Sequence, residues 1–168
     1  MRLILHDLPQ EEFQALGLQR LPENETMFVS ALDVNHYCVG CFACWLKTPG
    51  KCVIKDKYQD MGEKLSSVNE FIIISKATFG SYSSAIKNVL DRSISYVKPF
   101  FVIRHGEMHH EERYKNKLNI SAIFYGDCSP WERDTAENLV MANAKNLNAF
   151  VPEVCFVDSV YELKEVLS

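Results

Sequence analysis

A run of five residues in the middle of the chain, Phe71-Ile-Ile-Ile-Ser75, constrains the fold more than any other feature of the sequence. It is continuously apolar and rich in β-branched side chains, without the alternation of polar residues that marks a half-exposed strand. Such a run is typical of a parallel sheet whose two faces are both covered. We therefore expect a buried strand here, in the interior of an α/β protein.

Strand and helix patterns alternate along the rest of the chain. We expect further strands at residues 2–6, 26–32, 118–125 and 154–157, and helices at 56–68, 82–97, from 129 onward and at 161–167. An apolar stripe from Tyr82 to Val97 supports the second helix. Ser129, followed by proline and then by glutamate at the third position, starts the third, and Asp56 with Gln59 resembles a capping box. The alternation predicts a parallel sheet joined by right-handed crossovers.

The length and the strand count narrow the architecture further. A chain of 168 residues suits one domain, spanning 1–168, since domains cluster around ~100–150 residues. Five strands predict a flavodoxin-like three-layer sandwich with a five-stranded parallel sheet in the order 2-1-3-4-5. The polar stretch 105–117 is long for a connection, and we expect a mobile or interface segment there.

Composition excludes several classes of protein. Hydrophobic residues make up 47% of the chain and charged residues 24%, which excludes a disordered chain. Eighteen basic against 22 acidic side chains disfavour nucleic-acid binding. No apolar run approaches the ~20 residues of a membrane span, and residues 1–8 do not resemble an export signal. We expect a soluble cytoplasmic protein with neither nucleic acid nor membrane as a partner.

Four of the six cysteines fall within fifteen residues and follow a C-x2-C-x2-C-x7-C pattern. They are Cys38, Cys41, Cys44 and Cys52. Without an export signal, metal or redox use is favoured over a disulfide framework. The spacing resembles an iron–sulfur ligand run, whereas structural zinc more often separates two C-x2-C pairs by a longer spacer. Lys47 and Lys51 would help to hold thiolates ionised, and the alternative is that the cysteines simply pack a compact loop.

Three loops, 7–12, 76–83 and 126–129, follow strands and should meet at the carboxyl edge of the sheet, where open parallel sheets bind ligands. The second loop offers hydroxyl groups, a glycine and two aromatic rings, which suit the polar edge and the face of a flat heteroaromatic ring. The alternative is an ordinary turn in which Ser81 or Ser83 caps the next helix. His105, His109 and His110 suit a solvated or interface role. Motifs of kinases and common hydrolases are absent from the sequence.

Two stretches resemble the NADPH-dependent FMN reductase-like flavoprotein family, including its iron–sulfur flavoprotein branch. The first is Asn35-His36-x-Cys38-x-Gly40-Cys41-Phe42-x-Cys44-Trp45-x-Lys47-Thr48-Pro49-Gly50-x-Cys52-x-Ile54-x-Asp56. The second is Phe79-Gly80-Ser81-Tyr82-Ser83, continuing through Lys87 to Asp91-Arg92. With the strand order, the resemblance extends from about residue 26 to residue 150.

The resemblance implies a flavodoxin-like fold, noncovalent FMN, and electron transfer from NAD(P)H to a small acceptor such as a quinone or free flavin. The residues implied to contact the isoalloxazine ring are Thr78, Phe79, Gly80, Ser81, Tyr82 and Ser83, with Gly126 and Asp127 on its other side. Cys38, Cys41, Cys44 and Cys52 would hold a 4Fe-4S cluster. No side chain is assigned a catalytic role. A homodimer or homotetramer is implied, with residues 96–101 and 105–117 as the expected interface.

The chain departs from the family at the loop that normally grips the FMN phosphate, which here reads His6-Asp7-Leu8-Pro9-Gln10-Glu11-Glu12. Backbone amides at a helix start bind phosphate, but Asp7, Glu11 and Glu12 would repel it. Lys76 and Thr78 replace the usual proline and aromatic residue of the second loop, and we expect Lys76 to supply compensating charge. Two other functions remain open: a non-enzymatic electron carrier, and a flavodoxin-like module that has lost FMN.

Overall fold

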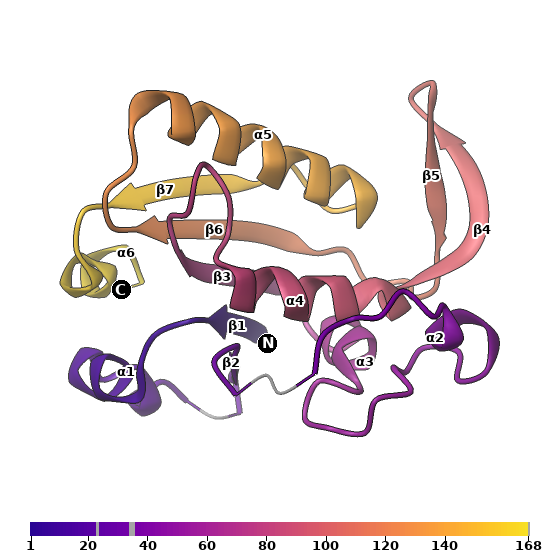
Figure 1. Ribbon diagram of the computed structural model, residues 1–168, viewed down its shortest axis with the longest axis horizontal. Coiled ribbons are helices and arrows are strands. Elements are labelled where there is room, and N and C mark those ends of the chain that lie inside the picture. The colour runs from indigo at the N-terminus through magenta and orange to yellow at the C-terminus, as the bar shows by residue number, and fades with distance from the viewer. Residues whose placement is uncertain (23, 34–35, 168) are drawn as a thin grey trace.

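The computed structural model describes residues 1–22, 24–33 and 36–167, and its centre is a five-stranded parallel sheet (Figure 1). The strands are β1 (Arg2–His6), β2 (Thr26–Ser30), β3 (Glu70–Lys76), β6 (Asn119–Tyr125) and β7 (Glu153–Val157), in the order β2-β1-β3-β6-β7. The predicted α/β class with a five-stranded parallel sheet is confirmed. The numbering departs from the expected 2-1-3-4-5 because two unpredicted strands, β4 and β5, precede β6 in the chain.

Helices cover both faces of the sheet. Helices α3 (Met61–Ser66), α4 (Ser84–Arg92) and α5 (Pro130–Asn146) pack on one face, and α1 (Gln10–Leu16) and α6 (Leu163–Val166) on the other. Because successive strand residues point to opposite faces, Phe71 and Ile73 of β3 join the first core and Ile74 joins the second. The continuous apolar run is thus explained by burial on both sides.

Strands β4 (Val97–Arg104) and β5 (Glu107–Glu112) form an antiparallel hairpin that projects from the rest of the molecule (Figure 1). His105 and Gly106 form its turn, and their φ angles of 52° and 82° are both positive, as a two-residue type I′ hairpin turn requires. Residues 105–117, expected to be a connecting segment, include the strand β5, which the sequence did not predict. Its polar sequence does not show the apolar alternation by which strands are recognised.

Three helix expectations need correction at their ends. The helix expected over 56–68 is only α3, and Asp56 starts no helix: its carboxylate accepts a hydrogen bond from the Tyr58 N–H at 3.0 Å. The helix expected over 82–97 is α4 followed by a 3-10 turn, Ser93–Tyr96. Residues 161–167 divide between a 3-10 turn at Val160–Glu162 and α6, and helices α1 and α2 (Ala43–Leu46) were not predicted.

The expected start of α5 is confirmed. Ser129 accepts from the Glu132 N–H, and the Glu132 carboxylate accepts from the Ser129 N–H at 2.9 Å, which completes a capping box. Ala136, Val140 and Ala144 are buried against the sheet. Among the described residues, no helix has the length and apolar character needed to cross a membrane.

Candidate functional site

Asp7 lies where β1 ends, between β1 and β3, and the strand order reverses at this point. Ligands of open parallel sheets bind in this crevice. The Asp7 side chain is buried, and both of its oxygens accept from the Lys76 N–H at 3.1 Å, while Ser75 Oγ lies 3.5 Å away. The Asp7 side chain therefore accepts hydrogen bonds from the Lys76 N–H and the Ser75 hydroxyl at the point where the strand order reverses.

Two titratable groups flank Asp7. Burial, with the nearby Asp7 carboxylate as the next cause, raises the pKa of Tyr125 above its usual value. Burial lowers the pKa of His6 to about 4, although the Asp33 carboxylate opposes the change. The imidazole of His6 stacks on Phe13 with ring centroids 4.7 Å apart, and its Nδ1 has no hydrogen-bond partner among the described residues. At neutral pH the His6 imidazole is therefore neutral, next to the buried side chain of Asp7.

The loop between β3 and α4 is a tight, well-braced turn. Thr78 and Ser81 exchange backbone hydrogen bonds of 3.0 and 2.9 Å, and Phe79 and Gly80 between them have φ of 50° and 71°. A Cβ on Gly80 would lie 2.8 Å from Thr135 Cβ, so the turn sits directly on the first part of α5. Phe79 is 91% exposed at the tip. The loop presents an aromatic ring on a rigid support.

The residues expected to contact a flavin ring do not all have free side chains. Tyr82 is buried, stacks on Phe124 at 5.3 Å and accepts from Asn143 Nδ2, so its ring belongs to the core. Ser83 caps α4 by accepting from the Ile86 N–H at 3.4 Å. The capping alternative considered for this loop is therefore correct for Ser83.

Backbone donors at this edge remain available. The N–H groups of Phe79, Gly80 and Asp127 make no hydrogen bond among the described residues. Gly126 has φ of 93° and its surroundings are open, with no atom within 4 Å of where a Cβ would stand. The edge thus offers backbone donors from two of its loops, one of which carries the exposed Phe79.

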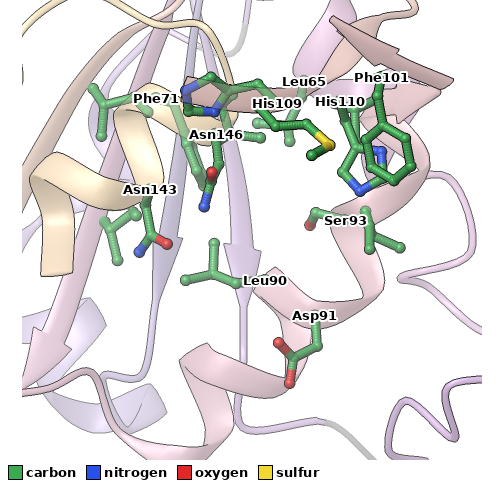
Figure 2. A pocket seen from close by; sticks show the side chains of 16 residues that line it. Leu65, Phe71, Leu90, Asp91, Ser93, Phe101, His109, His110, Asn143 and Asn146 are labelled. Atoms are coloured by element: carbon green, nitrogen blue, oxygen red, sulfur yellow. The ribbon is translucent and has the colours of Figure 1, made fainter. Parts of the chain in front are cut away.

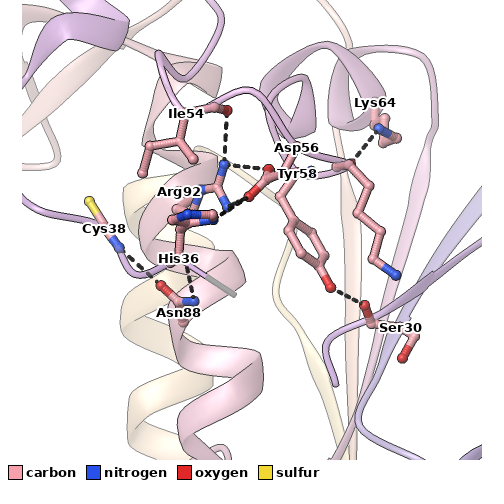
Figure 3. Close-up of polar contacts among 10 residues, drawn as sticks. Ser30, His36, Cys38, Ile54, Asp56, Tyr58, Lys64, Asn88 and Arg92 are labelled. Atoms are coloured by element: carbon pink, nitrogen blue, oxygen red, sulfur yellow. Dashed lines mark hydrogen bonds and ion pairs between the residues drawn. The ribbon is translucent and has the colours of Figure 1, made fainter. Parts of the chain in front are cut away.

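Helix α4 holds the cysteine segment in place (Figure 3). Asn88 is buried; its Oδ1 accepts from the Cys38 N–H at 3.1 Å and its Nδ2 donates to the His36 carbonyl at 3.2 Å. Further along, Trp45 Nε1 donates to the carbonyls of Ile94 and Val97 at 3.2 and 3.0 Å. The segment is therefore anchored by side-chain bonds to backbone groups at both places. Asn35 of the sequence motif lies outside the described residues.

Arg92, one helical turn after Asn88, holds the far end of the same segment (Figure 3). Its guanidinium makes two hydrogen bonds of 2.6 Å to the Asp56 carboxylate and one of 3.3 Å to the Ile54 carbonyl. Hydrogen bonding to Arg92 lowers the pKa of Asp56, so the pair is charged at neutral pH. The Arg92 side chain is fully buried, which charged residues almost never are unless they are paired.

All four clustered cysteines line one pocket of about 180 Å³. Its wall is otherwise mostly apolar and consists of Val39, Gly40, Phe42, Val53, Ile54, Asp91, Arg92 and Ile94. Burial, and then the proximity of the other three thiols, raise the pKa of Cys44. Within the described residues no three His, Cys, Asp or Glu side chains converge on a single metal-ion position. In a four-iron cluster each thiolate binds a different iron, so the ligands surround a larger body.

The positively charged residue beside these thiols is not one of the two lysines expected from the sequence. Lys51 forms an ion pair with Glu63 at 2.9 Å, and neither Lys47 nor Lys51 lines the pocket. The cation in its wall is Arg92, the last residue of α4. Its spacing of four from Asn88 was the available signal, because such residues share a helix face.

A larger cavity of about 510 Å³ lies between α4, α5 and the hairpin (Figure 2). Apolar side chains dominate its wall, and Asn143, Asn146, His109 and His110 contribute polar groups. Two of the three histidines expected to be solvated or in an interface, His109 and His110, thus line a cavity. This cavity is separate from the carboxyl edge of the sheet and adjoins the cysteine pocket, with which it shares Asp91 and Ile94.

Comparison with known families agrees with this geometry. A family model described as NADPH-dependent FMN reductase matches residues 12–124. The chain belongs to this family. An iron-sulfur flavoprotein of Methanocaldococcus jannaschii is 36% identical over 70 residues, which are 41% of this chain and 35% of that protein. The chain therefore matches about a third of the length of this curated relative.

Solved structures share the fold of this FMN reductase family member. The NAD(P)H:quinone oxidoreductase of Methanothermobacter marburgensis superposes with a TM-score of 0.57 and 12% identity, covering 99% of this chain and 93% of that one. An FMN-dependent NADH-azoreductase of Bacillus anthracis, in complex with FMN, gives a TM-score of 0.57 and 13% identity over 95% of this chain and 88% of that chain. At such identities the likeness establishes the fold alone.

Proposed function

We propose that this protein is an FMN-dependent oxidoreductase that passes electrons from NAD(P)H to a small acceptor such as a quinone or free flavin. We further propose that its fold is flavodoxin-like and that Cys38, Cys41, Cys44 and Cys52 hold a 4Fe-4S cluster. One observation carries the proposal: α4 begins at the loop proposed for the flavin and its last turns hold the cysteine segment. Nine helical residues span roughly 14 Å, so the two sites lie near opposite ends of one short, rigid element.

The carboxyl edge fits the isoalloxazine ring. Within the part of the chain that the structure describes, the backbone N–H groups of Phe79, Gly80 and Asp127 have no partner, and they suit the carbonyl oxygens and ring nitrogens of a flavin. The exposed Phe79 ring is placed to cover one face. FMN, when bound, supplies the hydride and single-electron chemistry, while these residues hold and orient the ring.

The FMN phosphate fits less well. Asp7 is buried at the switch point, and Glu11 and Glu12 occupy the first turn of α1. The cation proposed to offset these charges is Lys76, an exposed residue at the end of β3. A Lys76→Ala protein should therefore bind FMN more weakly, and unchanged affinity would remove Lys76 from the proposal.

The cysteine pocket fits a cluster by its donor set and by its surroundings. Four thiols share one pocket with largely apolar walls, which suits the low-dielectric setting of iron–sulfur centres. Arg92 is buried in the same wall, and its Nε–H has no hydrogen-bond partner among the described residues. A buried donor on a residue that lines a pocket with four cysteines is suited to an anionic occupant.

A second candidate function follows from Asp7. If the buried carboxylate at the switch point excludes the phosphate, the chain is a flavodoxin-like module that has lost FMN. An FMN titration distinguishes the two, because only the oxidoreductase binds the cofactor. A third candidate, a non-enzymatic electron carrier, would bind FMN but oxidise NAD(P)H slowly with every small acceptor tried.

The decisive experiment is an absorption spectrum of the protein purified without oxygen, followed by iron analysis, FMN titration and anaerobic NADPH oxidation with and without a quinone. We expect flavin bands, a broad additional absorbance from the cluster and about four irons per chain. Gly80→Ala should weaken FMN binding by about tenfold or more, equal to 1.4 kcal/mol, because the new methyl group displaces the loop from α5. Gly106→Ala is the matched control: its φ is also positive, at 82°, but it stands at the hairpin turn with open space around it.

We also propose that the protein is a homodimer or homotetramer built through the hairpin. Phe100, Phe101, Ile103 and Met108 are each about two-thirds exposed there, which is unusual for apolar side chains on one small element. Tyr96, also expected in the interface, is buried within the subunit, so the proposed surface leaves it out. Gel filtration of a Phe101→Ser, Ile103→Ser protein should yield monomers, and an unchanged elution volume would contradict the assignment.

A further inference from the structure

The second half of α4 presents two polar side chains, four residues apart, to the cysteine segment rather than to solvent or the core. Asn88 is buried, and its amide oxygen and nitrogen both bond to backbone groups of that segment. Arg92 is likewise buried, and its two terminal nitrogens bond to Asp56 and to the Ile54 carbonyl. This face of the helix is thus built around the segment that carries the cysteines.

One donor on this face lacks a partner. Arg92 Nε is buried and makes no hydrogen bond among the described residues, although every other nitrogen of the guanidinium does. A buried N–H without a partner is unfavourable and rare in folded proteins, so its presence needs an explanation. Arg92 lines the pocket that also contains Cys52 and the other three clustered cysteines.

The charges around the pocket also indicate a role for Arg92. The Asp56 carboxylate offsets the guanidinium, but a thiolate-ligated four-iron cluster would add net negative charge to the pocket. Asp91 also lines the pocket, whereas His36 lies 3.9 Å from Asp56, outside the residues that line it, and has a largely exposed side chain. Among the described residues, Arg92 is therefore the only cation in a wall that otherwise holds thiols, apolar groups and one carboxylate.

We propose that Arg92 is a positioning residue for the iron–sulfur cluster: its Nε–H donates to a sulfur of the cluster or of Cys52, and its charge makes the cluster easier to reduce. The inference rests on the proposed function, since it requires the cluster. Reduction adds one electron to the cluster, and a neighbouring positive charge and N–H···S bonds stabilise the added negative charge. Asp56 sets the position of the guanidinium through two short bonds and partly offsets its charge.

The test is a redox titration of the cluster, followed by electron paramagnetic resonance, on full-length protein purified without oxygen. In Arg92→Gln the cluster should become harder to reduce. We expect at least a tenfold lower ratio of reduced to oxidised cluster at a fixed potential, which for one electron is about 59 mV. Asp56→Asn keeps the guanidinium and removes the opposing charge, so its cluster should become easier to reduce. A purely structural role would not give shifts of opposite sign.

Arg113→Gln is the matched control, because Arg113 also donates to backbone carbonyls, those of Ser95 and Val97, but does not line the pocket. Its cluster should keep the wild-type potential.

If Arg92→Gln does not retain iron, Arg92→Lys replaces it: lysine keeps the charge but lacks Nε–H, and its cluster should still be harder to reduce than wild type. Equal potentials in iron-loaded wild-type and Arg92 variants, or shifts of the same sign in the Arg92 and Asp56 variants, overturn the inference. Wild-type protein without iron overturns the proposed cluster itself, which is a distinguishable result.

Discussion

His6 should make the stability of this protein depend on pH in a way that one substitution removes. The side chain ends β1, is buried, and stacks on Phe13. Burial lowers the pKa of His6 from 6.5 to about 4. The imidazole of the folded protein therefore stays neutral between pH 6.5 and about 4, a range in which the unfolded chain protonates it.

The sign follows from proton binding. Between pH 6.5 and about 4 the unfolded chain binds a proton at His6 that the folded protein does not, so falling pH favours unfolding. The stabilisation is complete above pH 6.5 and is lost as the pH falls to about 4. Because one pKa unit corresponds to ~1.36 kcal/mol, His6 should account for a loss of about 3 kcal/mol over this interval.

The measurement is the free energy of unfolding from urea titrations at pH 7 and pH 4, compared between wild type and His6→Phe. Phenylalanine keeps the stacked ring but does not titrate, so the variant should lose about 3 kcal/mol less than wild type on acidification. His105→Asn serves as the control, since His105 is exposed and its φ of 52° suits asparagine. Equal losses in wild type and His6→Phe would refute the assignment of a buried, neutral histidine at this position.

Three further substitutions test packing around the site by urea denaturation. Gly62→Ala should destabilise the protein by about 1–3 kcal/mol despite better helix propensity, because the added Cβ would lie 2.5 Å from Ser95 Oγ and 2.8 Å from a backbone nitrogen. Tyr58→Phe should cost about 1–2 kcal/mol, since the buried hydroxyl donates to a β2 carbonyl at 2.7 Å. Ser83→Ala should cost about 1 kcal/mol, because the Ile86 N–H at the start of α4 loses its cap. A wild-type midpoint for any of the three would contradict the corresponding contact.

The parts of the fold that were predictable are those with a local cause. Strand β3 is recognisable because both of its faces are buried, and α5 because Ser129 and Glu132 satisfy its first amides within four residues. The hairpin was not predictable: the sequence of β5 is polar, and its strand conformation comes from pairing with β4. Asp56 has the pattern of a helix cap, yet its carboxylate binds Arg92 instead.

The candidate site divides in the same manner. The sequence identified the cysteines and the Thr78–Ser83 loop from spacing and residue type, and the structure places the four thiols around one pocket. The sequence did not predict that Arg92 holds the cysteine segment or that Asp7 is buried. Each depends on partners from other elements: the Asp7 carboxylate meets the Lys76 N–H, and Arg92 meets residues of the segment before α3.

The sequence by itself determined the α/β class, the buried central strand and a compact group of four cysteines, because periodicity, β-branched runs and short spacings act through neighbours along the chain. Only the tertiary structure decided what surrounds that group. Asn88 reaches Cys38 across 50 positions and Arg92 reaches Asp56 across 36, contacts that exist because crossovers bring α4 against the cysteine segment. Burying a charged side chain is strongly unfavourable unless its partners are present. Because those partners come from distant parts of the chain, no local sequence pattern predicts the burial.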